Sequence, residues 1–271
     1  MMKRKIIDGH VHLLPDKLMR AIYRWFEENL SWDMPFKYDL EGYLNYLESL
    51  GISEMMVLGY VHKPEMSWGL NEWLNNVKEK YPQVKPYLAV HQDDRDKGKM
   101  VREFLGKGFL GAKIHCFVQK VGADDLRFFE VYRILVEEGK GLVLHGSGMP
   151  VKAEFIFPEQ VEKLLETFPG MKIMVAHLGL PDYLNEYLRL VDKYQNLWLD
   201  TAYVLGNPKF NNKYLRSVLL NYTERIIFGS DFPIMDYSPE LALEELFSFN
   251  LGREKEDLIL FRNAEEFMGR G

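Results

Sequence analysis

The feature that most constrains the fold is a regular alternation between short apolar runs and segments with helical periodicity. The apolar runs have the length, and the Gly, Asp or Pro boundaries, of buried strands. We predict strands at residues 5–8, 54–60, 84–90, 109–114, 141–144, 172–176, 197–200 and 225–228. This alternation implies a parallel sheet, and eight repeats with short connections favour a closed (β/α)8 TIM barrel over an open doubly wound sheet.

Residues between the predicted strands mark where helices begin and end. Ser67 and Ser238 suit helix N-caps, and Pro239 suits the first position of a helix. Gly51 and Gly139 suit the ends of helices. Because barrels of this class often exceed 200 residues, we assign residues 1–271 to a single α/β barrel domain.

One connection is much longer than the others. Residues 13–38 separate the first strand from its helix and are rich in aromatic side chains, including Trp25, Phe26, Trp32 and Phe36. Long loops in compact domains are often lids or binding elements. We therefore predict a long loop insertion here, and a helical insertion that plugs one end of the barrel is the alternative.

Composition excludes several classes of function. A formal net charge of −6 disfavours nucleic-acid binding, which depends on Lys and Arg neutralising phosphates. Cys116 is the single cysteine, so no internal disulfide forms and a reducing cytoplasm is the expected compartment. Apolar runs fall well short of the ~20 residues that cross a bilayer, so no membrane association is expected. The sequence does not determine the oligomeric state, so a homo-oligomer is an open alternative.

The histidines share one kind of position in the sequence. Each lies at or just beyond the end of a predicted strand, and none falls within a predicted helix. They are His10, His12, His62, His91, His115, His145 and His177. In a parallel barrel the C-terminal ends of the strands meet at one face, where active sites are built. We expect the functional site at that face.

His10 and His12 flank a single residue at the end of the first strand. Side chains alternate along an extended chain, so both imidazoles point the same way and have the spacing of two ligands to one metal. The alternative is a hydrogen-bonded histidine pair at a strand end. The segments that follow the later strands favour the metal.

Three later segments carry a family resemblance. Leu144-His145-Gly146 ends the fifth strand, Val175-Ala176-His177-Leu178-Gly179 ends the sixth, and Phe228-Gly229-Ser230-Asp231-Phe232-Pro233 ends the eighth. Together with the His10 and His12 segment, they resemble the amidohydrolase superfamily, particularly its amidohydrolase-2 branch of hydrolases and non-oxidative decarboxylases. Asp200-Thr201 and Arg262-Asn263-Ala264 extend the likeness over essentially the whole chain.

The resemblance implies a divalent metal held by His10, His12, His145 and Asp231. One Zn²⁺ is the expected ion, with Mn²⁺ or Fe²⁺ as alternatives, because imidazoles and a carboxylate suit these metals. Asp231 is implied to accept a proton from metal-activated water. His177 is implied to act as a catalytic residue that orients or deprotonates this water, and a second ligand or a packed histidine is the alternative.

Lys113 and His115 end the fourth strand on one face. A carboxylated lysine at this position bridges two metals in some relatives, but we predict that both residues bind substrate near a single metal. A buried ammonium needs an opposite charge, either a substrate carboxylate or a protein ion pair. Other strand-end residues are candidate pocket liners. They are Tyr60, His62, His91, Lys152 and Tyr203.

These residues predict a metal-dependent hydrolase that cleaves an amide, lactone or ester bond of a small organic acid. A non-oxidative decarboxylase or a hydratase on the same metal is the enzymatic alternative, because the ligand set does not separate these reactions. A barrel that binds without catalysing is the alternative of another class.

Overall fold

Parallel strands alternate with helices through the residues that the computed structural model describes, which are 4–146, 154–210 and 212–270. Each strand pairs with the next in sequence, in the order β1 to β8. The strands are β1 (Ile7–Val11), β2 (Glu54–Leu58), β3 (Val84–Ala89), β4 (Gly111–Ile114), β5 (Gly141–Leu144), β6 (Lys172–Val175), β7 (Leu197–Asp200) and β8 (Ile226–Ile227). The predicted TIM barrel is confirmed.

Backbone hydrogen bonds close the sheet between β1 and the segment after β8. The Gly9 N–H donates to Phe228 O at 2.7 Å, the Asp231 N–H donates to His10 O at 2.9 Å, and the His12 N–H donates to Phe232 O at 2.8 Å. These bonds explain why β1 reaches Val11, whereas the sequence predicted its end at Asp8. They also hold two histidines next to Asp231.

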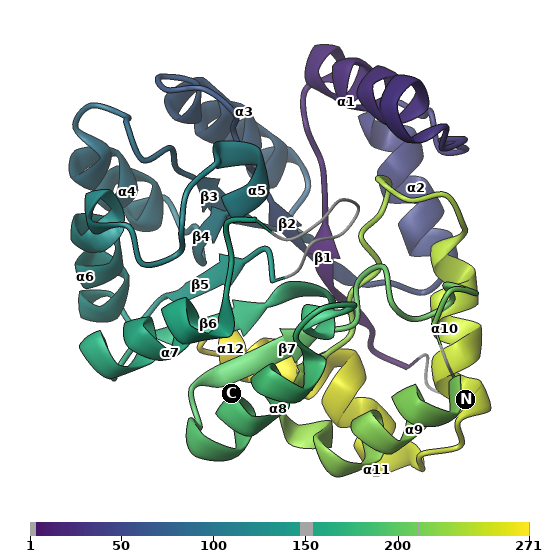
Figure 1. The fold of residues 1–271 in the computed structure, drawn as a ribbon. Helices are drawn as coiled ribbons and strands as arrows, with labels where there is room; N and C mark the ends of the chain where they lie inside the picture. Colours follow the sequence, from purple (N-terminus) through teal and green to yellow (C-terminus); the bar gives the residue numbers. More distant parts are fainter. Residues whose placement is uncertain (1–3, 147–153, 211, 271) are drawn as a thin grey trace.

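Helices surround the strands (Figure 1). The longer ones are α1 (Asp16–Leu30), α2 (Leu40–Ser49), α3 (Ser67–Lys80), α4 (Lys97–Gly106), α6 (Phe129–Glu137), α7 (Pro158–Thr167), α8 (Leu184–Lys193), α9 (Asn212–Asn221) and α10 (Pro239–Ser248). The shorter ones are α5 (Cys116–Gln119), α11 (Arg253–Asp257), α12 (Asn263–Phe267), η1 (Leu126–Phe128), η2 (Ala176–Gly179), η3 (Thr223–Arg225) and the π-helical η4 (Leu258–Arg262).

The predicted helix boundaries are largely right. Ser238 caps α10 by accepting a hydrogen bond from the Glu240 N–H, and Pro239 occupies the first position. Ser67 is wrong as an N-cap, because α3 starts at Ser67 itself and the Ser67 hydroxyl donates to Asp94. None of the described helices combines the length and the apolar character needed to cross a membrane.

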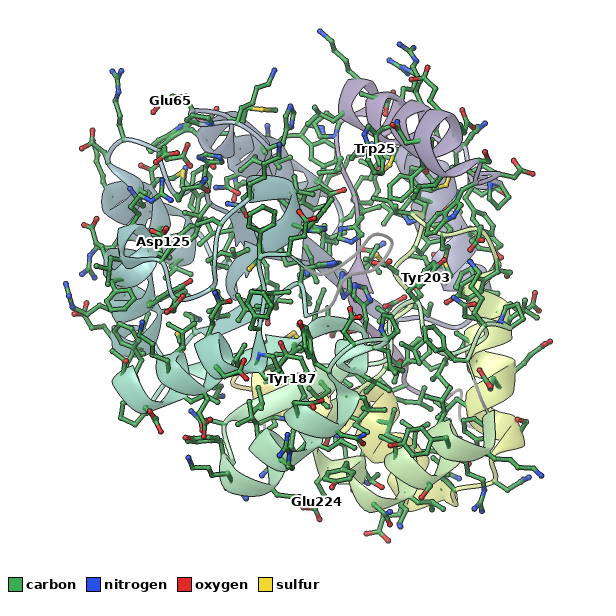
Figure 2. All side chains as sticks on the ribbon, in the orientation of Figure 1. Trp25, Glu65, Asp125, Tyr187, Tyr203 and Glu224 are labelled. Atoms are coloured by element: carbon green, nitrogen blue, oxygen red, sulfur yellow. The ribbon has the colours of Figure 1, made fainter. Side chains whose placement is uncertain are left out.

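The predicted loop at 13–38 contains helix α1 over Asp16–Leu30, so the prediction of a loop is corrected to a largely helical insertion. Met19 and Tyr23, one helical turn apart, are buried on its inner face. Trp25 is exposed on α1, and Tyr203, on the segment after β7, is labelled below it in Figure 2. The helical spacing of its buried residues was the available signal for this helix.

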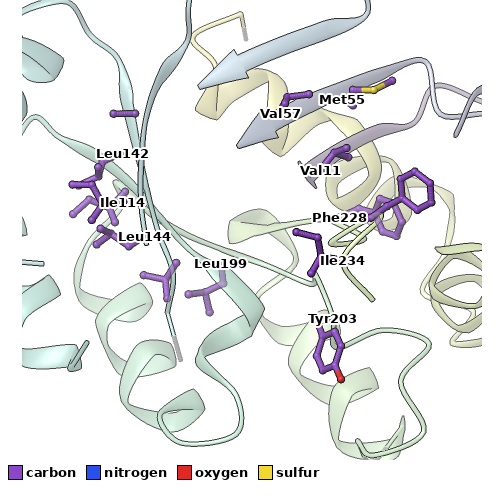
Figure 3. Close-up of a cluster of buried hydrophobic side chains, with 14 of the residues drawn as sticks. Val11, Met55, Val57, Ile114, Leu142, Leu144, Leu199, Tyr203, Phe228 and Ile234 are labelled. Carbon is purple, nitrogen blue, oxygen red and sulfur yellow. The ribbon is translucent and has the colours of Figure 1, made fainter. Parts of the chain in front are cut away.

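Two layers of apolar side chains hold the barrel together. The outer layer lies between strands and helices, where Ile114 and Leu144 occupy paired positions on β4 and β5 (Figure 3). The inner layer fills the barrel with side chains from its strands, namely Ile7, Met56, Leu58, Tyr87, Val143, Met174, Trp198 and Ile227. Phe267 of α12 packs on Tyr87 and Trp198 and so closes one end.

Candidate metal centre

The site begins with three side chains at the junction of β1 and β8. His10 and His12 lie on and just after β1, and Asp231 follows β8 with a left-handed backbone, at φ 72°. His10 Nε2 lies 3.2 Å from His12 Nε2. Asp231 Oδ1 lies 3.3 Å from His10 Nε2 and 3.1 Å from His12 Nε2. The alternation predicted from the sequence therefore brings both rings to one point.

The opposite nitrogen of each ring identifies its tautomer. His10 Nδ1–H donates to Asp200 Oδ2 at 2.8 Å, and His12 Nδ1–H donates to the Leu58 carbonyl at 3.0 Å. Both acceptors lack a hydrogen to give, so each ring carries its hydrogen on Nδ1 and presents a lone pair on Nε2. Burial, followed by the charge of Lys113, lowers the pKa of His10 well below its usual value and keeps this ring neutral.

Three lone pairs therefore face one another across 3.1–3.3 Å. Two imidazole acceptors and a carboxylate repel each other at this separation unless a cation lies between them. Oriented imidazoles whose second nitrogen is bound to a carboxylate or carbonyl are typical of metal sites in proteins. The donor set thus fits a divalent metal.

His177 and His145 border the same space. His177 follows β6 with φ 62°, its Nδ1–H donates to Ala202 O at 2.9 Å, and its Nε2 lies 3.3 Å from His145 Nδ1. Among the described residues, the ligand atoms of His10, His177 and Asp231 all lie within 4.8 Å of one another. The structure therefore places His177 as near to the centre as a ligand would be, beside His145.

Asp200 is a buried carboxylate beside the cluster, and the sequence did not indicate its contacts with the histidines. Its Oδ2 binds His10, and its Oδ1 accepts the backbone N–H groups of His177 at 2.9 Å and Ala202 at 3.1 Å. One buried carboxylate thus orients a histidine of β1 and the turn that carries His177. An acidic residue directly after the buried run Leu197–Trp198–Leu199 was the available signal.

A small cavity of about 50 Å³ lies beside these groups. Its lining joins predicted residues with new ones, which are His12, Phe26, Trp32, Tyr60, His115, His145, His177, Tyr203, Asp231 and Ile234. His115 stacks on His145 with ring centroids 3.9 Å apart. Tyr60 contacts both His12 and His115 through its ring. The structure therefore brings Tyr60, His115 and Tyr203 to the cavity.

Lys113 lies on β4 with an exposed fraction of 0%, and its Nζ has no hydrogen-bond partner among the described residues. Burial lowers its pKa to about 8, although the charges of Asp200 and Asp231 oppose this effect. With no exposed surface, the Lys113 side chain does not line the cavity in this structure. Its contact with substrate stays a prediction.

His62 and His91 do not join the cluster. His62 is exposed on the segment after β2. His91 is buried, but its Nδ1 accepts the Asp93 N–H at 3.2 Å and its own N–H donates to Asp94 at 2.8 Å, which ties it to its own loop. The position after a strand did not determine where these side chains point, so the structure does not bring them to the cavity and their role in binding substrate stays a prediction. Lys152 lies outside the described residues.

Comparison with known proteins supplies the family and the fold. A family model described as amidohydrolase matches residues 7–270. None of the curated proteins matches the chain. An uncharacterised TIM-barrel protein from Bordetella bronchiseptica has 19% identity and a TM-score of 0.75, with 98% of this chain and 99% of that chain covered.

Two further solved structures with this fold are of enzymes with a named activity. A probable 2-pyrone-4,6-dicarboxylic acid hydrolase from Acinetobacter baumannii, with citric acid bound, has 14% identity and a TM-score of 0.68, covering 97% of this chain and 99% of that chain. A 5-carboxyvanillate decarboxylase from Novosphingobium aromaticivorans, with manganese and 3-methoxy-4-hydroxy-5-nitrobenzoic acid bound, has 14% identity and a TM-score of 0.66, covering 98% and 97%. At these identities the likeness shows the fold.

Proposed function

Because this chain belongs to the amidohydrolase superfamily, in its amidohydrolase-2 branch, we propose that it is a metal-dependent hydrolase acting on an amide, lactone or ester bond of a small organic acid. The observation that carries the proposal is the convergence of His10 Nε2, His12 Nε2 and Asp231 Oδ1 within 3.3 Å, with both rings fixed as lone-pair donors. Such a centre selects a cation and leaves room beside it for a reacting group.

We propose His10, His12, His145 and Asp231 as the ligands of one metal. Zn²⁺ fits this nitrogen-rich set, and the manganese in the decarboxylase neighbour makes Mn²⁺ the alternative to test. When bound, the metal supplies Lewis acidity that polarises a carbonyl and acidifies water. The buried, neutral ring of His10 suits a ligand rather than a titrating base.

The protein groups around the cavity have distinct proposed roles. The Asp231 carboxylate, which is 13% exposed, accepts the proton of the attacking water and returns it to the leaving group. His177, which lines the cavity with its Nε2 3.3 Å from His145 Nδ1, orients that water. Burial raises the pKa of Tyr60, so its hydroxyl stays protonated and donates a hydrogen bond to an oxygen of the substrate.

Decarboxylation or hydration on the same residues is the second candidate, and the fold shared with a carboxyvanillate decarboxylase favours including it. The two reactions differ in their products. Screening lactones, amides and carboxylated aromatic acids with metal-reconstituted protein, while trapping carbon dioxide, separates hydrolysis from decarboxylation. Carbon dioxide released in step with substrate loss would replace the hydrolase proposal.

The metal site is tested first by substitution. His10→Ala and His12→Ala should each lower bound metal well below one equivalent while circular dichroism shows a folded barrel. His62→Ala is the matched control, because this exposed histidine lies outside the cluster and its loss should leave metal content unchanged. Full metal in both site variants contradicts the ligand assignment, whereas failure of the unmodified protein to hold stoichiometric metal would favour a binding barrel without catalysis. The lone, buried Cys116 supports the further proposal of a cytoplasmic location.

A further inference from the structure

The cavity beside the metal centre is smaller than a substrate needs. Its volume of about 50 Å³ compares with ~300–1,000 Å³ for pockets that take small molecules. Since a water needs ~10–15 Å³ of such volume, the cavity accommodates only a few waters. Part of its wall must therefore move before an organic acid reaches Asp231.

The described part of this wall is built in two ways. The histidine side stands on or directly after barrel strands, and backbone hydrogen bonds hold it from both neighbours. The opposite side comes from the insertion between β1 and α2, which contributes Phe26 and Trp32. Both of these aromatic side chains are only partly buried. The insertion is therefore the side that moves more readily.

Ring contacts hold Trp32 in place. Its indole stacks on Tyr203 at 5.3 Å with an angle of 7° between the planes, and Phe26 stacks on it at 5.1 Å. Lys209 Nζ lies 5.4 Å from the centre of the Trp32 ring and 3.7 Å from Asp236 Oδ2. Stacking and cation–π contacts of this kind contribute ~0.5–1.5 kcal/mol each, which suits a contact that opens and closes.

The chain is anchored firmly only a few residues later. Phe36 is 8% exposed, and its carbonyl accepts the hydroxyl groups of Tyr23 at 2.7 Å and Tyr43 at 3.2 Å. Ser31, directly before Trp32, has a left-handed backbone with φ 53°. Trp32 thus lies between a bend and an anchor, so its indole can leave Tyr203 without disturbing the barrel.

We propose that Trp32 is the gate of this cavity and the residue that limits the size of the acid that enters. In the closed arrangement its indole lies on Tyr203 and fills the space that the substrate will take. Opening separates the two rings and joins the cavity to solvent. The inference deepens the proposed function, since it takes this cavity as the place where the acid binds.

Chemical footprinting tests the gate without any turnover. Diethyl pyrocarbonate modifies neutral histidines, and mass spectrometry gives the rate at each one. His115 lines the cavity and is not a proposed ligand, whereas the exposed His62 is an internal reference. The ratio of the His115 rate to the His62 rate should rise about tenfold in Trp32→Ala, the effect of losing ~1.4 kcal/mol of ring contacts. Trp32→Phe, which keeps a ring on Tyr203, should give a smaller rise.

Trp68→Ala is the matched control, because Trp68 is a partly exposed tryptophan on α3, away from this cavity. Its ratio should equal that of the unmodified chain. An unchanged ratio in folded Trp32→Ala overturns the gate, and so does an equal rise in Trp68→Ala, which would mean general loosening. Because His115 reports in metal-free and zinc-loaded protein alike, a failure of the metal proposal is seen separately, as missing metal.

Size selection is measured with two probes on zinc-loaded protein. Calorimetry with acetate and benzoate should show that Trp32→Ala binds benzoate more tightly relative to acetate than the unmodified chain does. Identical selectivity in the two proteins contradicts a role in size limitation. Trp32→Phe keeps the measurement informative if the alanine variant fails to fold.

Discussion

The two ends of this barrel are built from the same strands and differ in almost every other respect. At one end the strands carry apolar side chains such as Val143 and Trp198, and Phe267 packs against them. At the other end, two residues further along, β5 leads to His145 and β7 ends in Asp200. A shift of two residues along each strand therefore separates packing from chemistry.

The contrast follows from what each end must satisfy. At the apolar end, van der Waals contact suffices, and a Cβ on Gly141 would lie 2.6 Å from the Phe267 ring, so this position excludes larger residues. At the histidine end, Nδ1 of each ring donates a hydrogen bond to a fixed acceptor, so that Nε2 presents a lone pair to a metal. Stability and activity should consequently respond to different substitutions.

The largest effect is expected at the histidine end, from Asp231→Asn. The amide keeps an oxygen for the metal but cannot accept a proton at neutral pH, so turnover should fall by about 10³-fold or more while metal is retained. Elemental analysis and steady-state kinetics on the same preparation measure both. Asp192→Asn, on the exposed side of α8, is the control and should be unaffected. Near-normal turnover of metal-loaded Asp231→Asn contradicts the proposed mechanism.

Phe267→Ala probes the other end. Removing this ring, which is 1% exposed, leaves a cavity against Tyr87 and Trp198 and should lower the free energy of unfolding by about 3–5 kcal/mol. Chemical denaturation measures the loss, and bound metal should stay at one equivalent below the transition. Phe247→Ala, at 37% exposed, should cost far less. Loss of metal in folded Phe267→Ala would show that the two ends are not independent.

Asp200→Asn sharpens the contrast, because it alters orientation without removing a ligand. The amide can turn its NH₂ toward His10 Nδ1 and so favour the wrong tautomer. Metal affinity should fall by about 10–100-fold, as read by competition with a chromogenic chelator. Asp192→Asn, the same substitution on the exposed side of α8, is the control. Unchanged affinity in Asp200→Asn would mean that the His10–Asp200 bond is structural only.

The smallest effect is expected from Lys113→Met. This residue is fully buried beside the charges of Asp200 and Asp231, and we assign it no ligand role. The variant should keep a single tightly bound metal, as counted by elemental analysis. Two equivalents in the unmodified protein that fall to one or none in Lys113→Met would instead establish a bridging lysine and a binuclear site.

The sequence predicted the barrel from local patterns, whereas His145, His177 and Asp231 were assigned through the resemblance to the amidohydrolase superfamily. Strand periodicity gives β5 and β7 with their observed bounds, and the spacing of His10 and His12 follows from alternation along one strand. The bond from His10 to Asp200 spans 190 positions and exists only once the barrel has formed, so no local pattern contains it.

The remaining differences also have physical causes. His91 lies beyond β3, where alternation no longer applies and Asp94 determines the turn of the loop. In the insertion, Met19, Tyr23 and Phe26 have the spacing of a helix face, a pattern that the aromatic richness of the segment obscured. Which residues of the insertion line the cavity depends on how α1 packs against the barrel. This packing is a tertiary interaction that local sequence patterns do not contain.

The central claim is that His10, His12 and Asp231 converge on a metal. The most direct test is anomalous scattering at the zinc absorption edge from crystals of zinc-reconstituted protein. We predict a single peak about 2.0–2.2 Å from His10 Nε2, His12 Nε2, an Asp231 oxygen and a His145 nitrogen. A map with no peak between these atoms, from protein shown to be folded, would contradict the account.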